Sequence, residues 1–208
     1  MEKNIGVNSR LETFCDGIFA IAITLLVLDI KVPPLASVHS VADVWDDIGK
    51  LWPSFFALCF SFIIILVSWI GHHGIFTLID KTSSRFQLAN GFFMFTVIII
   101  PFPTSFMAEY LNTPYAQPAV VVYSLCCLLH NCGWNLLHRY ILVPKSLLKD
   151  SVGIIEMKRI GKGSNYGFCL YAALAILAWW LPYVAIILNA LTWIYWLYLS
   201  ISVRRAMK

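Results

Sequence analysis

Charged side chains stand at both ends of the first long apolar segment of the chain. Arg10, Glu12 and Asp16 lie at its start, and Asp29 lies at its end. A charge inside the hydrocarbon layer of a membrane is costly, so groups of this kind need a partner or a water-filled surrounding. An arginine here is suited to bind a carboxylate or a backbone carbonyl. We therefore expect Arg10 to contact another helix or another subunit.

A second polar set, Trp69, His72 and His73, stands near the end of the next apolar segment. These residues have the same predicted depth as Asp16. A histidine there can donate a hydrogen bond to a carboxylate and would tie the first helix to the second. Two adjacent histidines without further ligands favour packing or hydrogen bonding over metal binding. The sequence leaves open which of the two makes the contact.

The fourth apolar segment carries a further polar cluster of His130, Asn131, Asn135 and His138. At about 100° of rotation per residue, the two histidines are about 80° apart around a helix, so they do not form the one-face pair of a zinc-binding helix. Hydrogen bonds between helices are the expected role. A metal site built on both histidine pairs stays open as an alternative.

The apolar residues of the first segment form a stripe. At about 100° per residue, its members fall within about 60° of one another. They are Phe14, Ile21, Leu25 and Leu28, with Arg10 on the same side. Asp16 falls about 200° away from Phe14. If the stripe lines a pathway, Asp16 points into neighbouring helices and acts as a structural anchor rather than as an ion ligand.

The elements that carry these residues are predicted to be membrane-spanning helices. Of the 208 residues, 60% are hydrophobic and 12% are charged, whereas soluble domains are about one quarter charged. Six segments reach or approach the roughly 20 apolar residues that cross a hydrocarbon layer of about 30 Å. They are 11–31, 52–78, 87–108, 117–141, 165–181 and 183–203, with Pro182 marking a tight hairpin between the last two. The expected fold class is all-α, a polytopic membrane protein that forms a single domain over residues 1–208.

The distribution of charge predicts the orientation of these helices. Cytoplasmic loops are enriched in Lys and Arg, and all of the 15 such residues except Lys31 and Lys50 fall on one side of the predicted membrane. Both termini are therefore predicted to be cytoplasmic. The basic stretch 139–162 could contact anionic lipid headgroups, although topology alone explains its charge.

The predicted outer side carries a group of acidic residues. They are Asp29, Asp43, Asp46, Asp47 and Glu109. An acidic vestibule would raise the local concentration of cations at a pore mouth. A merely solvated loop is the simpler explanation of the same residues.

The residues Arg10 to Asp16, with the sequence RLETFCD, resemble the RxxxFSD signature that opens the first helix of the transmembrane protein 175 family of potassium channels, in its prokaryotic single-repeat form. The segments WIGHHGIF (69–76) and PFPT (101–104), together with Asn90 and Glu109, also resemble the second and third helices of that family. The resemblance covers the whole chain in length, helix count and helix order.

This resemblance implies a homotetramer of six-helix subunits, with the four first helices around a central pore. The isoleucine constriction of the family falls on Ile21, its further hydrophobic layers on Leu25 and Leu28, and its neighbouring polar position on Thr24. Its structural network matches the set Arg10, Phe14, Cys15, Asp16 and Trp69 with a histidine at 72 or 73. Cys15 departs from the serine of the motif, and a thiol is a weaker hydrogen-bonding group than a hydroxyl.

The expected function is a potassium-permeable cation channel in the cell membrane of a prokaryote. A hydrophobic ring has no ligands to replace ion hydration, so selectivity should come from the size of the constriction and from dehydration cost, and should be modest. The chain has no TVGYG filter, no voltage sensor, and no HExxH or GxSxG motif, so we expect no enzyme activity. Partners are expected to be a second copy of the chain, the lipid bilayer and monovalent cations. No cofactor and no nucleic acid is expected, since the net charge is only +4.

Two other functions stay open. One is an intramembrane metal-dependent enzyme built on the histidines. The other is a secondary transporter or an assembly scaffold, and the small number of carboxylates within the apolar segments argues against coupled transport.

Overall fold

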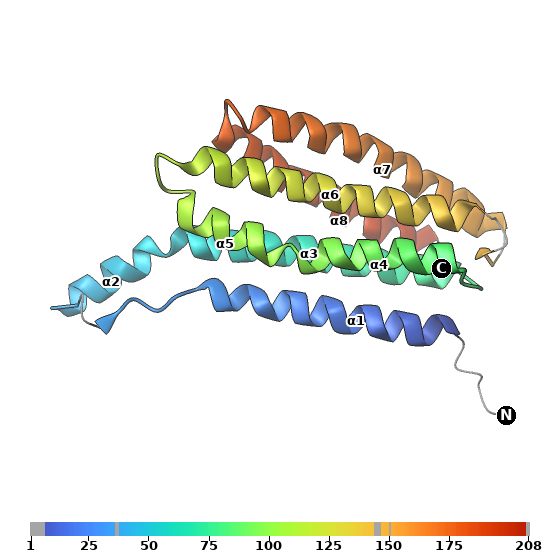
Figure 1. Ribbon diagram of the computed structural model, residues 1–208, viewed down its shortest axis with the longest axis horizontal. Coiled ribbons are helices and arrows are strands. Elements are labelled where there is room, and N and C mark those ends of the chain that lie inside the picture. The colour runs from blue at the N-terminus through green and yellow to red at the C-terminus, as the bar shows by residue number, and fades with distance from the viewer. Residues whose placement is uncertain (1–6, 36–37, 144–146, 150, 207–208) are drawn as a thin grey trace.

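A computed structural model describes residues 7–35, 38–143, 147–149 and 151–206, and the fold is helical as expected (Figure 1). In chain order its elements are α1 (Val7–Leu25), the 3₁₀ helix η1 (Leu26–Asp29), α2 (Val41–Lys50), α3 (Trp52–Leu78), α4 (Ser84–Ile98), α5 (Pro101–Tyr110), α6 (Ala116–Leu142), α7 (Ser151–Leu177) and α8 (Pro182–Ala206). The predicted hairpin at Pro182 is present, because α7 ends at Leu177 and α8 begins at this proline.

Four stretches of the described chain are long and apolar enough to cross a membrane. They are Asn8–Leu28, Trp52–Leu78, Ser84–Tyr110 and Ala116–Leu142. The predicted fifth segment, 165–181, is the second half of a longer helix, since α7 begins at Ser151 and its first half carries several charged residues. In α8 the described apolar part is the shorter stretch Pro182–Tyr198. The fifth and sixth spans therefore remain predictions.

The predicted segment 87–108 is confirmed as part of one candidate span, Ser84–Tyr110. It is not one continuous helix, because α4 ends at Ile98 and α5 begins at Pro101. A proline inside a helix removes a backbone hydrogen bond and clashes with the preceding turn, so Pro101 starts a new helix instead. The acidic outer segment is not only a loop, because it contains α2. Ser40 caps this helix, and its side chain accepts a hydrogen bond from the Asp43 backbone N–H at 3.2 Å.

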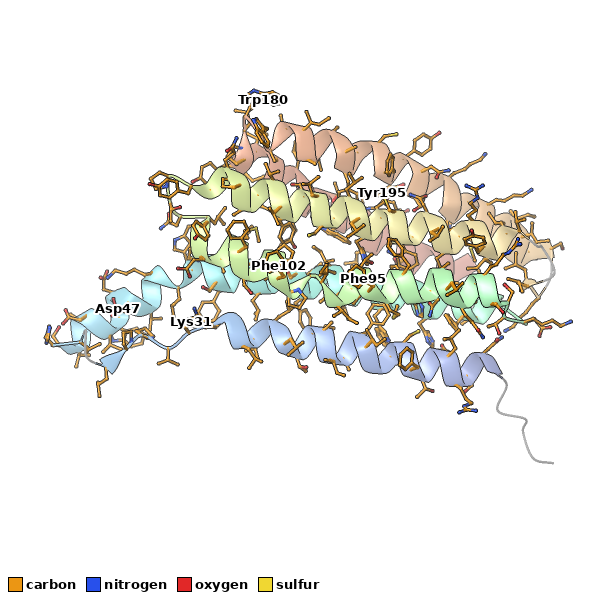
Figure 2. The ribbon with its side chains drawn as sticks, in the orientation of Figure 1. Lys31, Asp47, Phe95, Phe102, Trp180 and Tyr195 are labelled. Atoms are coloured by element: carbon orange, nitrogen blue, oxygen red, sulfur yellow. The ribbon has the colours of Figure 1, made fainter. Side chains whose placement is uncertain are left out.

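The long helices run side by side in one bundle (Figure 1). Helix α1 lies along one side of the bundle, packed on α3 and α4. Helix α6 packs against α4, α5, α7 and α8, and α7 lies on the side opposite to α1. Helix α2 extends past one end of the bundle, where Lys31 and Asp47 also lie (Figure 2). The site candidates on α1 are therefore at the edge of the subunit, not in its centre.

Glycines allow two close helix contacts. A Cβ atom at Gly133 on α6 would lie 3.2 Å from the ring of Phe93 on α4, and one at Gly167 on α7 would lie 2.6 Å from the ring of Trp196 on α8. Small residues at such crossings let helices approach closely in a membrane, where van der Waals packing drives helix association. The bundle around α6 is therefore tightly packed.

Helix ends and loops that carry basic residues meet at one end of the bundle. The Asn8 side chain on α1 donates to the Asp80 carbonyl oxygen at 2.9 Å, and Lys149 Nζ donates to the Thr77 carbonyl oxygen at 2.7 Å. An isolated antiparallel bridge joins Ile79 to Leu148. We call this the basic end. The start of α1 and the end of α8 lie here, which agrees with an even number of passes between them (Figure 1).

Candidate functional site

Helix α1 has two faces that differ in burial. One face packs on α3 and α4, and its residues are 0–2% exposed. This face consists of Cys15, Phe19 and Ala22, and Leu26 continues it into η1. The spacing of four, three and four residues keeps these side chains on one side of the helix.

The predicted stripe lies on another side of α1 and faces away from the subunit. The exposed fractions are 63% for Phe14, 61% for Ile21, 40% for Leu25 and 72% for Leu28. Thr24 is exposed beside them, and its hydroxyl donates to the Ile21 carbonyl oxygen at 2.9 Å. The stripe residues are thus gathered on a free surface of α1, which Leu28 continues into η1.

Among the four candidate spans, α1 is the least covered. In its most apolar stretch 22% of the residues are buried inside the subunit, against 39–44% in the other three spans. A membrane helix associates through packing contacts, and α1 makes few of these within its own subunit. Its free surface is therefore available to lipid or to other copies of the chain.

Polar contacts fasten α1 to α3 near the basic end. The Trp69 indole N–H donates to Asp16 Oδ1 at 2.8 Å, so Asp16 points at a neighbouring helix. The expected histidine contact to a carboxylate is also present, but its partner is Glu12. His73 Nδ1 lies 2.9 Å from Glu12 Oε1. Glu12 precedes Asp16 by one helical turn, and this spacing is the signal that could have identified it.

His72 has a different partner and a different environment. It is fully buried, and its Nε2 donates to Asn90 Oδ1 on α4 at 2.8 Å. The Asn90 side-chain amide in turn donates to the Cys15 sulfur on α1 at 3.0 Å. The ring of His72 is stacked on Phe93 with centroids 5.7 Å apart. Both adjacent histidines therefore make a polar contact with another helix, and Asn90 of α4 links α1 and α3 through its side chain.

Arg10 has no partner within the described part of the subunit. Arg10 is exposed at the start of α1, and its side chain forms no ion pair and no hydrogen bond with the described residues. The predicted contact to another helix of the same chain is absent from this part. A contact to another subunit remains a prediction.

The acidic residues of the predicted outer side are held locally in α2. Asp43 Oδ2 accepts from the His39 backbone N–H at 2.9 Å, and this bond is the main reason why the pKa of the carboxyl lies below its usual value. Lys50 Nζ lies 2.7 Å from Asp46 and 2.9 Å from Asp47. The positive charge of this one lysine thus partly offsets the negative charge of the three carboxylates. The side chain of Asp29 lies outside the described residues.

The polar cluster of α6 also divides among different partners. His130 lies between the hydroxyls of Ser68 and Thr96, at 2.8 and 2.9 Å, which gives the expected bonds between helices. Asn135 donates to the Ser164 carbonyl oxygen on α7 at 3.2 Å. Within the described ranges, no group of three or more His, Cys, Asp or Glu residues is placed to hold a metal ion. The histidines of α3 and α6 therefore do not come together in one metal site.

These contacts define what the candidate site can do. Apart from Arg10 and the hydroxyls of Thr13 and Thr24, the exposed side chains on the free face of α1 are apolar, so this face offers no set of ligands for an ion and no reacting group. Glu12 and Asp16, on the side away from the stripe, fix α1 to α3 near one end of the helix. A surface of this kind can line a narrow passage when it meets copies of itself.

Comparison with known proteins gives consistent results. The family model described as endosomal/lysosomal potassium channel TMEM175 matches residues 10–101. A potassium channel of Chamaesiphon minutus is 41% identical over 175 residues, which make up 83% of this chain and 86% of the relative. A potassium channel of a Chryseobacterium species is 28% identical over 204 residues, or 96% of this chain and 97% of the relative.

Solved structures show the same likeness. The crystal structure of a lysosomal potassium-selective channel TMEM175 homolog from Chamaesiphon minutus superposes with a TM-score of 0.83 at 35% sequence identity. The superposition covers 93% of this chain and 97% of that one. The similarity therefore extends over nearly the full length of both chains.

Proposed function

This chain belongs to the TMEM175 family of potassium channels, and on that premise we propose that four copies of it assemble around a potassium-permeable pore lined by α1. The observation that carries the proposal is the free apolar face of α1, where Ile21 is 61% exposed and Leu28 is 72% exposed in the single subunit. One such face cannot enclose a water-filled path through lipid by itself. A closed symmetric assembly of several copies can.

In the proposed assembly, α7 and α8 supply the fifth and sixth spans. Each subunit then crosses the membrane with both termini in the cytoplasm of a prokaryotic cell. The support is the gathering of basic residues at one end of the bundle, because cytoplasmic segments are enriched in Lys and Arg. Among the lysines and arginines that the structure describes, only Lys31 and Lys50 lie at the opposite end.

The proposed constriction consists of rings of Ile21, Leu25 and Leu28. Such rings narrow the passage and control its wetting, and they discriminate between ions through size and dehydration cost. Modest preference for potassium follows. Thr24 sits beside the Ile21 ring, where its hydroxyl is bonded to the Ile21 carbonyl oxygen. Potassium is the permeant ion, and the pore needs no cofactor.

The contacts of Glu12 and Asp16 with α3 hold α1 in its orientation in this proposal. They lie on the side of α1 away from the stripe, so they set which face meets the symmetry axis. Arg10 stands on the stripe side at the cytoplasmic mouth and is available to a neighbouring subunit. Asp43, Asp46 and Asp47, with Asp29, supply negative charge near the outer mouth, partly offset by Lys50.

An ion-flux measurement tests this function directly. Purified protein reconstituted in potassium-loaded vesicles is expected to release potassium when a proton ionophore completes the circuit, as followed by a pH-sensitive dye. Release of sodium from sodium-loaded vesicles is expected to be slower but measurable, because hydrophobic rings select modestly. Protein-free vesicles are the control. Absence of potassium release from protein that is correctly folded would contradict the proposed function.

A further inference from the structure

A groove runs between α6 and α7 at the basic end of the subunit. Its volume is about 890 Å³, and it is open to the surroundings of the bundle. Arg139 at the end of α6 and Lys158 and Lys162 on α7 line one part of it. Leu136 and Phe168 line the part that lies deeper along the two helices. The groove therefore has its cations near the basic end, beside Leu142 and Val143. Its deeper part is lined by Leu136 and Phe168 together with Asn135, Asn165 and two cysteines.

The cationic end has no carboxylate of its own. No Asp or Glu lines the groove, and none of its three basic residues has an ion pair with the described residues. The nearest acid in sequence, Glu156, is occupied, because Arg159 Nε lies 3.1 Å from both of its carboxylate oxygens. Three exposed cations thus converge without a counter-charge from the described part of the subunit.

His138 lies between the groove and a second cavity that is lined by α3, α6, α7 and α8. It is only 4% exposed, and both of its ring nitrogens are covered and have no hydrogen-bond partner among the described residues. A headgroup in the open groove does not reach these nitrogens, so its recognition rests on the three cations.

The order of the basic and apolar residues along the groove matches the order of headgroup and acyl chain in a phospholipid. Arg139 is one helical turn closer to the membrane boundary than Leu136, and Lys162 is nearly two turns closer than Phe168. A headgroup phosphate would meet the cations, and an acyl chain would follow Leu136 and Phe168 towards the membrane centre. Free phosphate matches only the first half of this arrangement.

We propose that this groove is a binding site for an anionic phospholipid of the leaflet at the basic end, with the phosphate between Arg139, Lys158 and Lys162. Basic pockets between membrane helices on the cytoplasmic side are suited to such headgroups. The site lies on α6 and α7, apart from the free face of α1, so lipid binding and ion flux can be measured separately.

The test uses the full-length protein, delipidated in detergent, and native mass spectrometry with added phosphatidylglycerol or phosphatidylcholine. Wild-type protein is expected to retain phosphatidylglycerol in preference to phosphatidylcholine. The double variant Lys158→Gln with Lys162→Gln is expected to bind phosphatidylglycerol about 30-fold more weakly, which corresponds to about 1 kcal/mol for each basic residue. Lys81→Gln with Arg85→Gln removes the same charge at the same end, outside the groove, and is expected to bind like wild type.

A second pair of variants tests the shape of the groove. Gly161 lines it, and a Cβ atom there would meet only His138 and Leu142, both at 3.9 Å. Gly161→Ala should therefore leave lipid binding unchanged, whereas the ring of Gly161→Phe should occupy the groove and abolish the preference for phosphatidylglycerol. Circular dichroism checks that both variants keep their helices.

Three outcomes would overturn the proposal. Equal loss of binding in both charge-removing double variants would assign the attraction to the basic surface as a whole. Unchanged binding in folded Gly161→Phe protein would place the lipid elsewhere. Displacement of the lipid by inorganic phosphate alone would make the site a phosphate site. None of these outcomes depends on whether the protein conducts potassium.

Discussion

Replacing Ile21 with asparagine is expected to raise potassium flux on the order of tenfold, which corresponds to a barrier lower by about 1.4 kcal/mol. In the proposed pore, Ile21 forms the narrowest ring, and its side chains give a passing ion nothing to replace its water. An amide side chain has both a carbonyl acceptor and N–H donors. It would keep the constriction wet and lower the cost of dehydration, so the preference for potassium over sodium should fall as well.

The same vesicle assay checks this prediction, with Ala20→Asn as a matched control. Ala20 is also exposed, but it lies about 100° from Ile21 around the helix. An asparagine at this position should leave flux and selectivity near the wild-type values. Equal effects at both positions, or no effect at Ile21, would show that the stripe does not face the ion path.

Replacing Asn90 with leucine is expected to destabilise the subunit by about 1–3 kcal/mol. The change leaves the buried His72 Nε2 and the Cys15 sulfur without their partner on α4. Desolvated polar groups without a hydrogen bond cost free energy, and water cannot reach this position because both Cys15 and His72 are 0% exposed. The measurement is the free energy of unfolding in mixed micelles.

A double variant separates the lost hydrogen bond from a loss of packing. His72→Phe combined with Asn90→Leu removes both polar partners and keeps an aromatic ring against Phe93, on which His72 is stacked. Replacing both partners of a buried hydrogen bond by apolar groups of similar shape can be nearly neutral. The double variant should therefore be more stable than Asn90→Leu alone. If the two effects simply add, the hydrogen bond is not the source of the cost.

The overall helical arrangement was predictable because apolar length, proline positions and charge asymmetry act locally along the chain. The family prediction drawn from Arg10 to Asp16 is confirmed by the relatives. Helix α2 was missed because its ten residues are too few and too polar for a membrane segment, and its start depends on the cap at Ser40. The extension of α7 to Ser151 was missed because hydropathy describes the membrane part of a helix and not the part that continues into water.

The partners of individual polar residues were harder to predict. A helical wheel gives the direction of a side chain on its own helix, so it correctly separates Asp16 from Ile21. It does not give the rotation of the neighbouring helix. That rotation places His73 against Glu12 and turns His72 towards Asn90. The role of the apolar stripe depends on further subunits and remains a prediction.

The central claim is that the free face of α1 lines a path shared by several subunits. Labelling of the Leu28→Cys variant with a membrane-impermeant cationic thiol reagent tests this claim most directly, because Leu28 lies near the outer end of the path. Val27→Cys is the control, since Val27 is also exposed (56%) but points to another side of the 3₁₀ helix η1. The unmodified sequence controls for the exposed Cys59 and Cys169. The account predicts that labelling at position 28 blocks potassium flux and that labelling at position 27 does not. Full labelling at position 28 with unchanged flux would contradict it.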